Sequence, residues 1–452
     1  MDTLMLSEIA ALLDAPLVGA DTRIEAVATD SRSLPAGALF VALRGERFDG
    51  HDFIAQALTA GAAAVLVDRP GDWGLPSLLV DDTRLALGRL ASAWRQRLPV
   101  KLVAVTGSNG KTTVKEMTAA IMRQCGPTLA TAGNLNNDIG MPLTLLRLTG
   151  EHAYAVVEMG ASSLGEIDYL ARLARPDVGI INNAGPAHLE GFGSQDAVAR
   201  GKGEMVQALG PDAAAVINAD DAYAPLWREY AAGRRVLDFA IEQPAAISAR
   251  AIDGSRFILR TPTGEAVVTL PLPGRHNILN ALAAAAAAIA LGVPLAQIVT
   301  GLEAVPSVKG RLTRRAAVAG AWLLDDSYNA NPNSLRAGLQ VLAGEAGERW
   351  LVLGDMAELG PEAEALHAQA GETALALGIH RLFAVGRLAP AAAARFGGRG
   401  ESFDSKAALL ARLMELLEPG VTVLVKGSRS SGMEQVVEAL LPAEPVQASQ
   451  GD

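Results

Sequence analysis

The chain has 452 residues, of which half are hydrophobic and 19% are charged, so it is long enough for two or three globular domains. A net charge of −10 and an aromatic content of 4% argue against a nucleic-acid-binding protein, because such proteins need basic surface and rings that stack on bases. Any anionic ligand must therefore be held by local basic groups that act against the overall field.

Cysteine usage and the N-terminal residues favour a cytoplasmic protein. The single cysteine, Cys125, cannot form an internal disulfide bond, which fits a reducing compartment. No basic residue precedes Arg23, so the N-terminus does not resemble a signal peptide. The longest apolar run, 278–299, is mostly alanine and is interrupted by Gly292 and Pro294. A buried helix that ends near Gly292 is therefore favoured over a membrane span.

Short elements alternate in the first part of the chain. Apolar runs at 37–43 and 62–68 predict strands, and the segment between them predicts a helix. A longer amphipathic helix is expected over 82–98, with Asp82 as its N-cap. We place a domain boundary at that cap, which gives a small N-terminal α/β domain of residues 1–82.

The middle of the chain predicts a parallel α/β sheet. Four apolar segments are separated by helical stretches: 101–107, 153–160, 177–185 and 213–220. Residues 248–272 instead predict short antiparallel strands around a glycine turn, and the alanine-rich helix closes a central domain of residues 83–309.

A second α/β pattern fills the last third. Its four apolar strands are expected at 321–327, 349–356, 381–386 and 422–428. Each is followed by turn residues, which favours a second, smaller parallel sheet in a C-terminal domain of residues 310–452.

The stretch "VAVTGSNGKTTVKEM" (103–117) predicts a phosphate-binding turn between a strand and a helix. Gly110, Lys111 and Thr112 match the end of the P-loop pattern, whereas Gly107 lies two residues nearer than that pattern requires. The expected cradle comprises Gly107, Ser108, Asn109, Gly110, Lys111, Thr112 and Thr113. The alternative is a plain glycine turn with a solvated lysine. The flanking strand and helix favour the nucleotide site, with Lys111 on the β and γ phosphates.

Three further groups follow strands at the edge where the phosphate loop lies. Glu158 and His188 are candidate Mg²⁺ ligands together with Thr112, although a surface carboxylate and an ordinary loop histidine are the alternatives. Lys202 is unexpected there, because an ammonium cannot bind a metal ion. It either contacts phosphate directly or is chemically modified.

Amide-rich segments provide the remaining candidates. Asn137 lies in an Asn/Gly-rich loop, and Asn277 and Asn280 share one face of a helix, where they could contact a purine or cap the helix. The polar cluster 325–337 follows a strand, and Lys426, Ser428 and Arg429 end another before a helix. The last two segments indicate a second anion-binding edge.

These motifs, in this order, resemble the Mur ligase family. They include "TGSNGKTT", "GNLNNDIG", "KGEM", "GRHNILNALAA", "DDSYNANP" and "KGSRSSGME". The resemblance runs from "ATDSRSLPAGALF" to the last helix. "DDSYNANP" and "KGSRSSGME" point to the members that add a dipeptide, and the D-N-P-R stretch of the diaminopimelate-adding members is absent from the sequence.

The resemblance implies three domains and a ligase reaction. The N-terminal domain would hold the UDP end of a UDP-N-acetylmuramoyl-tripeptide, the central domain ATP with Mg²⁺, and the Rossmann-like domain D-alanyl-D-alanine. ATP would phosphorylate the tripeptide carboxylate, and the dipeptide amine would attack the acyl phosphate. The C-terminal domain would swing onto the central one when substrates bind. We expect a monomeric cytoplasmic enzyme of peptidoglycan synthesis that has no nucleic-acid partner.

The resemblance implies a role for each residue of this chain that matches a family motif. Lys111, His188 and Lys202 are implied as catalytic groups, and the lysine that matches Lys202 is carbamylated in related ligases. Beyond the phosphate loop, the implied ATP-binding residues are Asn277, Asn280, Arg311, Asp326 and Tyr328. The implied residues for the other substrates are Ser31, Arg32, Asn137, Asn329, Asn331, Lys426, Ser428 and Arg429. Two alternatives stay open: a folylpolyglutamate synthase and a P-loop regulatory ATPase.

Overall fold

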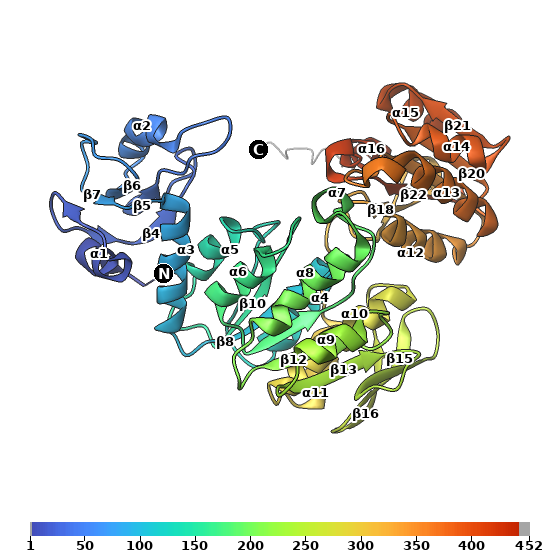
Figure 1. Ribbon diagram of the computed structural model, residues 1–452. Coiled ribbons are helices and arrows are strands. Elements are labelled where there is room, and N and C mark those ends of the chain that lie inside the picture. Colours follow the sequence, from blue (N-terminus) through green and yellow to red (C-terminus); the bar gives the residue numbers. More distant parts are fainter. Residues whose placement is uncertain (1, 443–452) are drawn as a thin grey trace, which may run out of the picture.

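The computed structural model describes residues 2–442, and three large sheets follow one another along the chain (Figure 1). The N-terminal sheet has the order β2-β7-β6-β5-β4, and only its β2–β7 pair is antiparallel. Its strands are β2 (Leu17–Val18), β4 (Ala26–Ala28), β5 (Ala38–Val41), β6 (Ala64–Val67) and β7 (Ser77–Leu79). Beside it lie β1 (Leu4–Met5), α1 (Leu6–Leu13), β3 (Arg23–Ile24), η1 (Gly50–Phe53) and α2 (Ile54–Thr59).

Helix α3 (Thr83–Gln96) leads from this sheet into the next. The Asp82 carboxylate accepts hydrogen bonds from the backbone N–H groups of Arg84 and Leu85, which confirms the expected N-cap. The buried face of the helix contains Leu87, Leu90, Ala91 and Trp94. These side chains share a core with α1 and with the central domain.

The central sheet has nine strands in the order β16-β15-β14-β13-β12-β11-β8-β10-β9, parallel from β14 to β9. They are β8 (Lys101–Thr106), β9 (Thr128–Ala130), β10 (Tyr154–Glu158), β11 (Val178–Ile181), β12 (Ala214–Asn218), β13 (Arg235–Ala240), β14 (Ile247–Ala251), β15 (Arg256–Thr261) and β16 (Gly264–Thr269). The antiparallel β14, β15 and β16 confirm the prediction for 248–272. The short β9 and the mixed-polarity β13 were not predicted.

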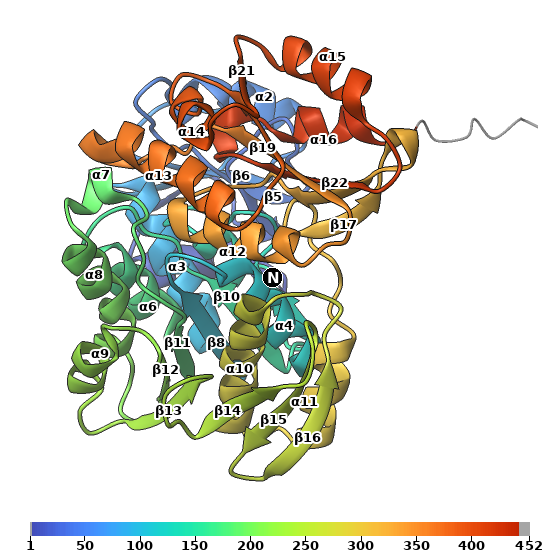
Figure 2. The ribbon, with the colours of Figure 1, turned by 90° about the vertical axis from the view of Figure 1, so that its right-hand side faces the viewer.

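Helices cover both faces of the central sheet. On one side lie α4 (Lys111–Arg123), α10 (Arg275–Ala290) and α11 (Leu295–Glu303); the other side carries α6 (Glu166–Ala174), α8 (Gln195–Gln207) and α9 (Ala224–Tyr230) (Figure 2). The short α5 (Gly140–Leu145) packs on α3, and α7 (Leu189–Phe192) precedes α8. The alanine-rich helix ends before Gly292 as expected, and no helix in the described residues has the length and apolar character needed to cross a membrane.

The C-terminal sheet has six strands in the order β17-β18-β22-β19-β20-β21. They are β17 (Thr313–Ala316), β18 (Trp322–Asp326), β19 (Glu348–Gly354), β20 (Arg381–Val385), β21 (Gly400–Phe403) and β22 (Val421–Lys426). Its helices are η2 (Val318–Gly320), α12 (Pro332–Ala343), η3 (Gly360–Glu362), α13 (Ala363–Ala376), α14 (Pro390–Phe396), α15 (Lys406–Leu416), η4 (Arg429–Ser431) and α16 (Glu434–Leu440). The four predicted parallel strands are confirmed, and β17 and β21 extend the sheet at its edges.

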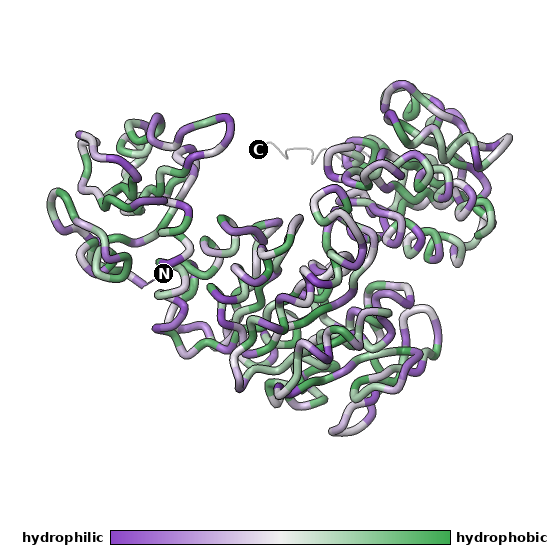
Figure 3. Tube along the Cα trace, viewed as in Figure 1, coloured by the Kyte–Doolittle hydropathy of each residue, from purple (hydrophilic) through white to green (hydrophobic). Residues whose placement is uncertain are grey.

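Hydrophobic segments run through the interior of each domain, and hydrophilic ones lie mostly at its periphery (Figure 3). The expected domain divisions after residues 82 and 309 fall between the three sheets and remain predictions. Residues 1 and 443–452 of the expected terminal domains lie outside the described part of the chain.

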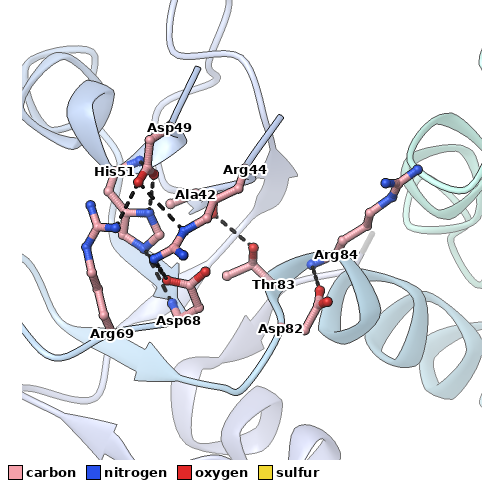
Figure 4. Close-up of polar contacts among 9 residues, drawn as sticks. All are labelled: Ala42, Arg44, Asp49, His51, Asp68, Arg69, Asp82, Thr83 and Arg84. Carbon is pink, nitrogen blue, oxygen red and sulfur yellow. Dashed lines mark hydrogen bonds and ion pairs between the residues drawn. The ribbon is translucent and has the colours of Figure 1, made fainter. Parts of the chain in front are cut away.

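A compact ion cluster fixes the loop after β5 in the N-terminal domain (Figure 4). The buried His51 ring lies between two carboxylates, with Nδ1 2.6 Å from Asp49 Oδ1 and Nε2 3.3 Å from Asp68 Oδ1. Arg69 reaches Asp49 at 2.8 Å, and Arg44 reaches Asp68 at 2.9 Å. Burial alone would raise the pKa of the Asp49 carboxyl, but hydrogen bonds from His51 and Arg69 hold that pKa well below its ordinary value.

Candidate active site

The phosphate loop lies at the carboxyl end of β8, between β11 and β10. Gly110 adopts a left-handed conformation with φ 78°, and a Cβ placed there would lie 2.4 Å from Asn280 Oδ1. Only glycine therefore fits at this point of the turn. The N–H of Ser108 donates to the Asn183 carbonyl, and the N–H of Asn109 donates to Asn183 Oδ1. Residues after β11 thus hold the loop in shape.

Lys111 begins α4 and folds back over the loop. Its Nζ donates to the carbonyl of Gly107 at 2.7 Å, and no carboxylate lies within 4 Å of it among the residues described. Burial lowers the pKa of the Lys111 ammonium; Glu158 opposes that shift, whereas Arg311 adds to it. The lysine is an electrostatically uncompensated donor at the place where a phosphate would lie.

Two of the expected metal-binding side chains are in contact. The Thr112 hydroxyl donates to Glu158 Oε2 at 2.8 Å, and Glu158 Oε1 accepts from Asn136 Nδ2 at 2.7 Å. Glu158 is the last residue of β10 and is 3% exposed. Asn136, in the Asn/Gly-rich loop, thus orients a carboxylate that faces the helix N-terminus.

His188 and Lys202 lie on the far side of the loop. His188 caps α7 in a left-handed conformation with φ 54°, and its buried Nδ1 faces a carboxylate oxygen of Glu358. Burial and then the charge of Lys111 lower the pKa of His188, although Glu358 acts in the opposite direction. A neutral imidazole at neutral pH can bind a metal ion.

Lys202 is buried on α8 with little to neutralise it. Its Nζ donates to the Ala161 carbonyl at 3.3 Å and lies 5.2 Å from the centre of the Phe192 ring. Burial lowers the pKa of Lys202 to about 7, and the charge of Lys111 contributes. Half of this amine would be uncharged near pH 7, which is the form that reacts with CO₂ to give a carbamate.

The C-terminal domain contacts the phosphate loop. Asn331 Nδ2 donates to Asn109 Oδ1 at 2.7 Å, and Arg311 approaches the Thr112 hydroxyl at 3.4 Å. Between the domains lies a cleft of about 420 Å³. Its lining includes Ser108, Asn109, Gly110, Lys111, Thr112, His188, Arg311, Asn329, Asn331, Glu358, Ser428 and Arg429. The structure therefore brings together two strand-end clusters that lie about 200 residues apart in sequence.

A second pocket adjoins the loop on the α10 side. It is lined by Asn109, Gly110, Thr113, Asn183, Asp221, His276, Asn277, Asn280, Arg311, Asp326, Asn333 and Lys426, among others. Asn280 accepts from Asn182 Nδ2 at 2.9 Å and donates to Asn277 Oδ1 at 3.2 Å, so both amides are fixed. Burial lowers the pKa of His276 to about 4, which leaves its ring neutral.

Lys426 and Asp326 form a buried ion pair in this second pocket. The sequence had grouped Lys426 with Ser428 and Arg429, but only the latter two line the interdomain cleft. Lys426 is the last residue of β22, whereas Ser428 and Arg429 lie beyond it, where the chain enters η4. Lys426 thus lines the same pocket as Asn277, Asn280 and Asp326.

Tyr328 organises the two arginines at the mouth of the cleft. The Arg311 guanidinium lies 4.2 Å from the centre of the Tyr328 ring, and that of Arg429 lies 5.6 Å from it. Both arginines also line the interdomain cleft, whereas Tyr328 lines a smaller pocket beside it.

The candidates for the UDP-linked substrate lie apart from the cleft. The Ser31 hydroxyl donates to Gln56 Oε1, and exposed Arg32 pairs with Asp30. Asn137 lines a separate pocket with Arg84, between α3 and α6. None of these three residues lines the interdomain cleft.

Sequence reasoning missed several residues that line the two pockets or contact their lining. Asn182 and Asn183 directly follow β11, and His276 lies within the quoted "GRHNILN" motif, so the strand-end argument could have included them. Glu358 lies in "GDMAELG", after β19, and no local pattern separates it from a surface carboxylate.

Three family models match consecutive parts of the chain. They are the Mur ligase family catalytic domain over residues 23–95, the Mur ligase middle domain over 105–288 and the Mur ligase glutamate ligase domain over 310–429. The chain belongs to the Mur ligase family. This confirms the family resemblance and the expected three-domain α/β architecture.

Relatives span nearly the whole chain. The UDP-N-acetylmuramoyl-tripeptide–D-alanyl-D-alanine ligase of Escherichia coli (strain K12) is 51% identical over 447 residues, which cover 97% of this chain and 99% of that protein. A crystal structure of MurF from Acinetobacter baumannii has a TM-score of 0.92 at 39% identity, covering 97% and 98%. MurF ligase from Thermotoga maritima in complex with ADP has a TM-score of 0.82 at 28% identity, covering 92% and 96%.

Proposed function

We propose that the chain is an ATP-dependent ligase that joins D-alanyl-D-alanine to UDP-N-acetylmuramoyl-tripeptide in peptidoglycan synthesis. The observation that carries this proposal is the cleft in which a phosphate loop from one domain faces Arg311 and Arg429 from another. The E. coli relative bears the name of this activity. Its 51% identity over almost the whole chain favours the activity over the folylpolyglutamate synthase and regulatory ATPase alternatives.

The chemistry has two steps. An oxygen of the tripeptide carboxylate attacks the γ-phosphorus of ATP, the bond to the bridging oxygen breaks, and ADP leaves. The dipeptide amine then attacks the acyl carbon, loses a proton and displaces phosphate. In the first step one anion attacks another, so the site must supply positive charge. Lys111 lies in the loop where the γ-phosphate would be cradled.

ATP would occupy the second pocket and the loop together. Asn277, Asn280 and the neutral His276 offer hydrogen bonds to a base, and the Asp326–Lys426 pair could contact the sugar and phosphates. The T. maritima relative binds ADP, which supports nucleotide use here.

The oxygen donors near the loop fit Mg²⁺. Thr112 and Glu158 lie together, and Mg²⁺ prefers one or two carboxylates plus substrate phosphates. His188 and a carbamylated Lys202 would complete the protein's ligands. When bound, the ion would offset the negative charge that gathers as carboxylate and phosphate approach.

Carbamylation would make Lys202 suited to this place. A buried ammonium without a carboxylate partner is unfavourable, and the lowered pKa supplies the neutral amine that the reaction with CO₂ requires. The product is an anion.

The other substrates would approach from two sides. Ser31, Arg32 and Asn137 would contact the UDP-linked tripeptide, and Asn329, Asn331, Ser428 and Arg429 the dipeptide. We also propose that the enzyme is cytoplasmic and monomeric, and that the domain of residues 310–452 moves closer when substrates bind.

The deciding experiment is ADP production by the purified chain with each substrate omitted in turn. We expect ADP only when ATP, the UDP-linked tripeptide and D-Ala-D-Ala are all present, with the joined pentapeptide product detected by mass. Hydrolysis that needs ATP alone would favour a regulatory ATPase, and activity with folate and glutamate would favour the synthase.

A further inference from the structure

The lining of the interdomain cleft contains one acidic side chain. Among the described residues that line it, Lys111, His188, Arg311 and Arg429 are basic, and Glu358 alone is acidic. ATP and the tripeptide carboxylate are anions, so neither calls for a carboxylate at this place. A carboxylate at this place suits a positively charged part of a ligand.

Contacts of Asp355 and Met356 hold the chain just before Glu358 in place. Glu358 lies after β19 with φ 60°, a left-handed conformation that is uncommon for a residue other than glycine. Its neighbour Met356 is fully buried and donates its N–H to His367 Nε2 at 2.9 Å. The carboxylate of Asp355 accepts hydrogen bonds from the backbone N–H groups of 387–389. Strain of this kind persists where surrounding structure enforces it, often at ligand sites.

The Glu358 carboxylate keeps capacity for a ligand. Its side chain is 54% exposed, and His188 is its one ionic contact within residues 2–442. On the same cleft, the Arg429 side chain is 67% exposed, and its guanidinium lies 3.4 Å from a carboxylate oxygen of Glu434. A carboxylate and a guanidinium thus face one space, which suits a ligand with an ammonium at one end and a carboxylate at the other.

We propose that Glu358 binds the ammonium group of D-Ala-D-Ala and thereby sets which end of the dipeptide faces the acyl phosphate. The inference rests on the proposed function, in which Arg429 holds the opposite, carboxylate end. Glu358 contacts His188, which belongs to the phosphate side of the cleft, so an amine held there lies beside the reacting carbon. The alanines at 330 and 357 line the same space and leave room for the small dipeptide side chains.

The test compares two ligands that differ only at the amine. D-Ala-D-Ala carries an ammonium, and D-lactoyl-D-alanine carries a hydroxyl in its place. KM for the first and the inhibition constant of the second are measured for wild type, Glu358→Gln, Glu358→Asp and the matched control Glu364→Gln, whose side chain lies on exposed α13.

We expect Glu358→Gln to raise KM for D-Ala-D-Ala on the order of tenfold, because a charge-assisted contact is lost. The inhibition constant of D-lactoyl-D-alanine should rise less, since a hydroxyl loses only a charge-assisted hydrogen bond and not an ion pair. Glu358→Asp should retain part of the preference for the ammonium, and the control should match wild type. A role confined to the His188 contact would weaken both ligands equally.

The proposal is overturned if wild type binds both ligands equally well, or if Glu358→Gln weakens both alike. The wild-type comparison needs no variant and therefore holds even if Glu358→Gln fails to fold. A wrong role for Glu358 and a wrong proposed function give different results with the wild type. If only the role of Glu358 is wrong, ADP production still depends on all three substrates. If the proposed function is wrong, the wild type does not use the dipeptide at all.

Discussion

Two charged clusters in this chain differ in how fully the protein itself neutralises them. In the N-terminal domain, the His51 ring lies between Asp49 and Asp68, and Arg44 and Arg69 reach the same carboxylates (Figure 4). Acids and bases match within the cluster. Because these charged groups neutralise one another, the cluster stabilises the loop and has little capacity to bind a ligand.

In the interdomain cleft, His188 and Arg429 have acidic partners, but two other basic side chains do not. Lys111 and Arg311 have no carboxylate within 4 Å in the part of the chain described, and Lys111 donates only to backbone carbonyls. Positive charge left over in a concave site is costly unless a ligand supplies the counter-charge. Charged side chains without a partner therefore indicate the site better than charged side chains as such. Substitutions in the cleft should lower activity, whereas substitutions in the N-terminal cluster should lower stability.

The largest expected effect is on catalysis, from Lys111→Ala. Loss of one charge contact to a developing transition state costs on the order of 3 kcal/mol or more, so turnover should fall about a hundredfold or further. Steady-state ADP production measures this loss, and thermal unfolding should show an intact fold. Lys101→Ala, at the exposed start of β8, the strand that precedes the loop, is the control. Similar turnover in both variants would remove Lys111 from the site.

Lys202→Ala should also be nearly inactive, on the order of a hundredfold below wild type, because an anionic ligand in the metal site would be lost. If the side chain is a carbamate, a small carboxylic acid in the buffer should restore part of the activity. Lys111→Ala provides the matched control, since an added anion cannot replace a cation. Equal responses of the two variants, or an unmodified amine mass in the nucleotide-bound enzyme, would contradict carbamylation.

Arg429→Ala should have a narrower effect. A guanidinium suits bidentate binding of a carboxylate, so KM for D-Ala-D-Ala should rise about tenfold, with KM for ATP changing little. Varying each substrate in turn measures the split. Arg387→Ala, exposed on the same domain, should behave as wild type. Small and equal changes in all three KM values would mean that Arg429 only supports the turn that begins η4.

Much of this site could be predicted because parallel strands bring their carboxyl ends to one edge. That rule linked Lys111 to Glu158 from the sequence, and the Thr112–Glu158 contact agrees with it. The sequence did not show that Lys426 lines a different pocket from Ser428 and Arg429, because β22 ends at Lys426 and the path of the turn after it cannot be predicted from residue spacing.

Glu358 could not be found by the same rule. Its importance depends on two domains meeting, so that a half-exposed carboxylate after β19 faces His188 from the other domain. The edge strand of the C-terminal sheet was missed for a different reason. Edge strand β17, with sequence "TRRA", has no apolar pattern, because an edge strand needs hydrogen bonds on only one side and little burial.

The smallest effect on turnover should come from the matched cluster. His51→Ala removes a buried ring that bridges Asp49 and Asp68, which should lower the free energy of unfolding by about 2 kcal/mol, because two partly buried carboxylates lose a partner. Denaturant unfolding measures this, and kcat at saturating substrate should stay near that of wild type. Arg32→Ala breaks an exposed pair of the same domain and should hardly change stability. If His51→Ala lowered kcat as much as Lys111→Ala and left stability unchanged, the cluster around His51 would contribute to catalysis.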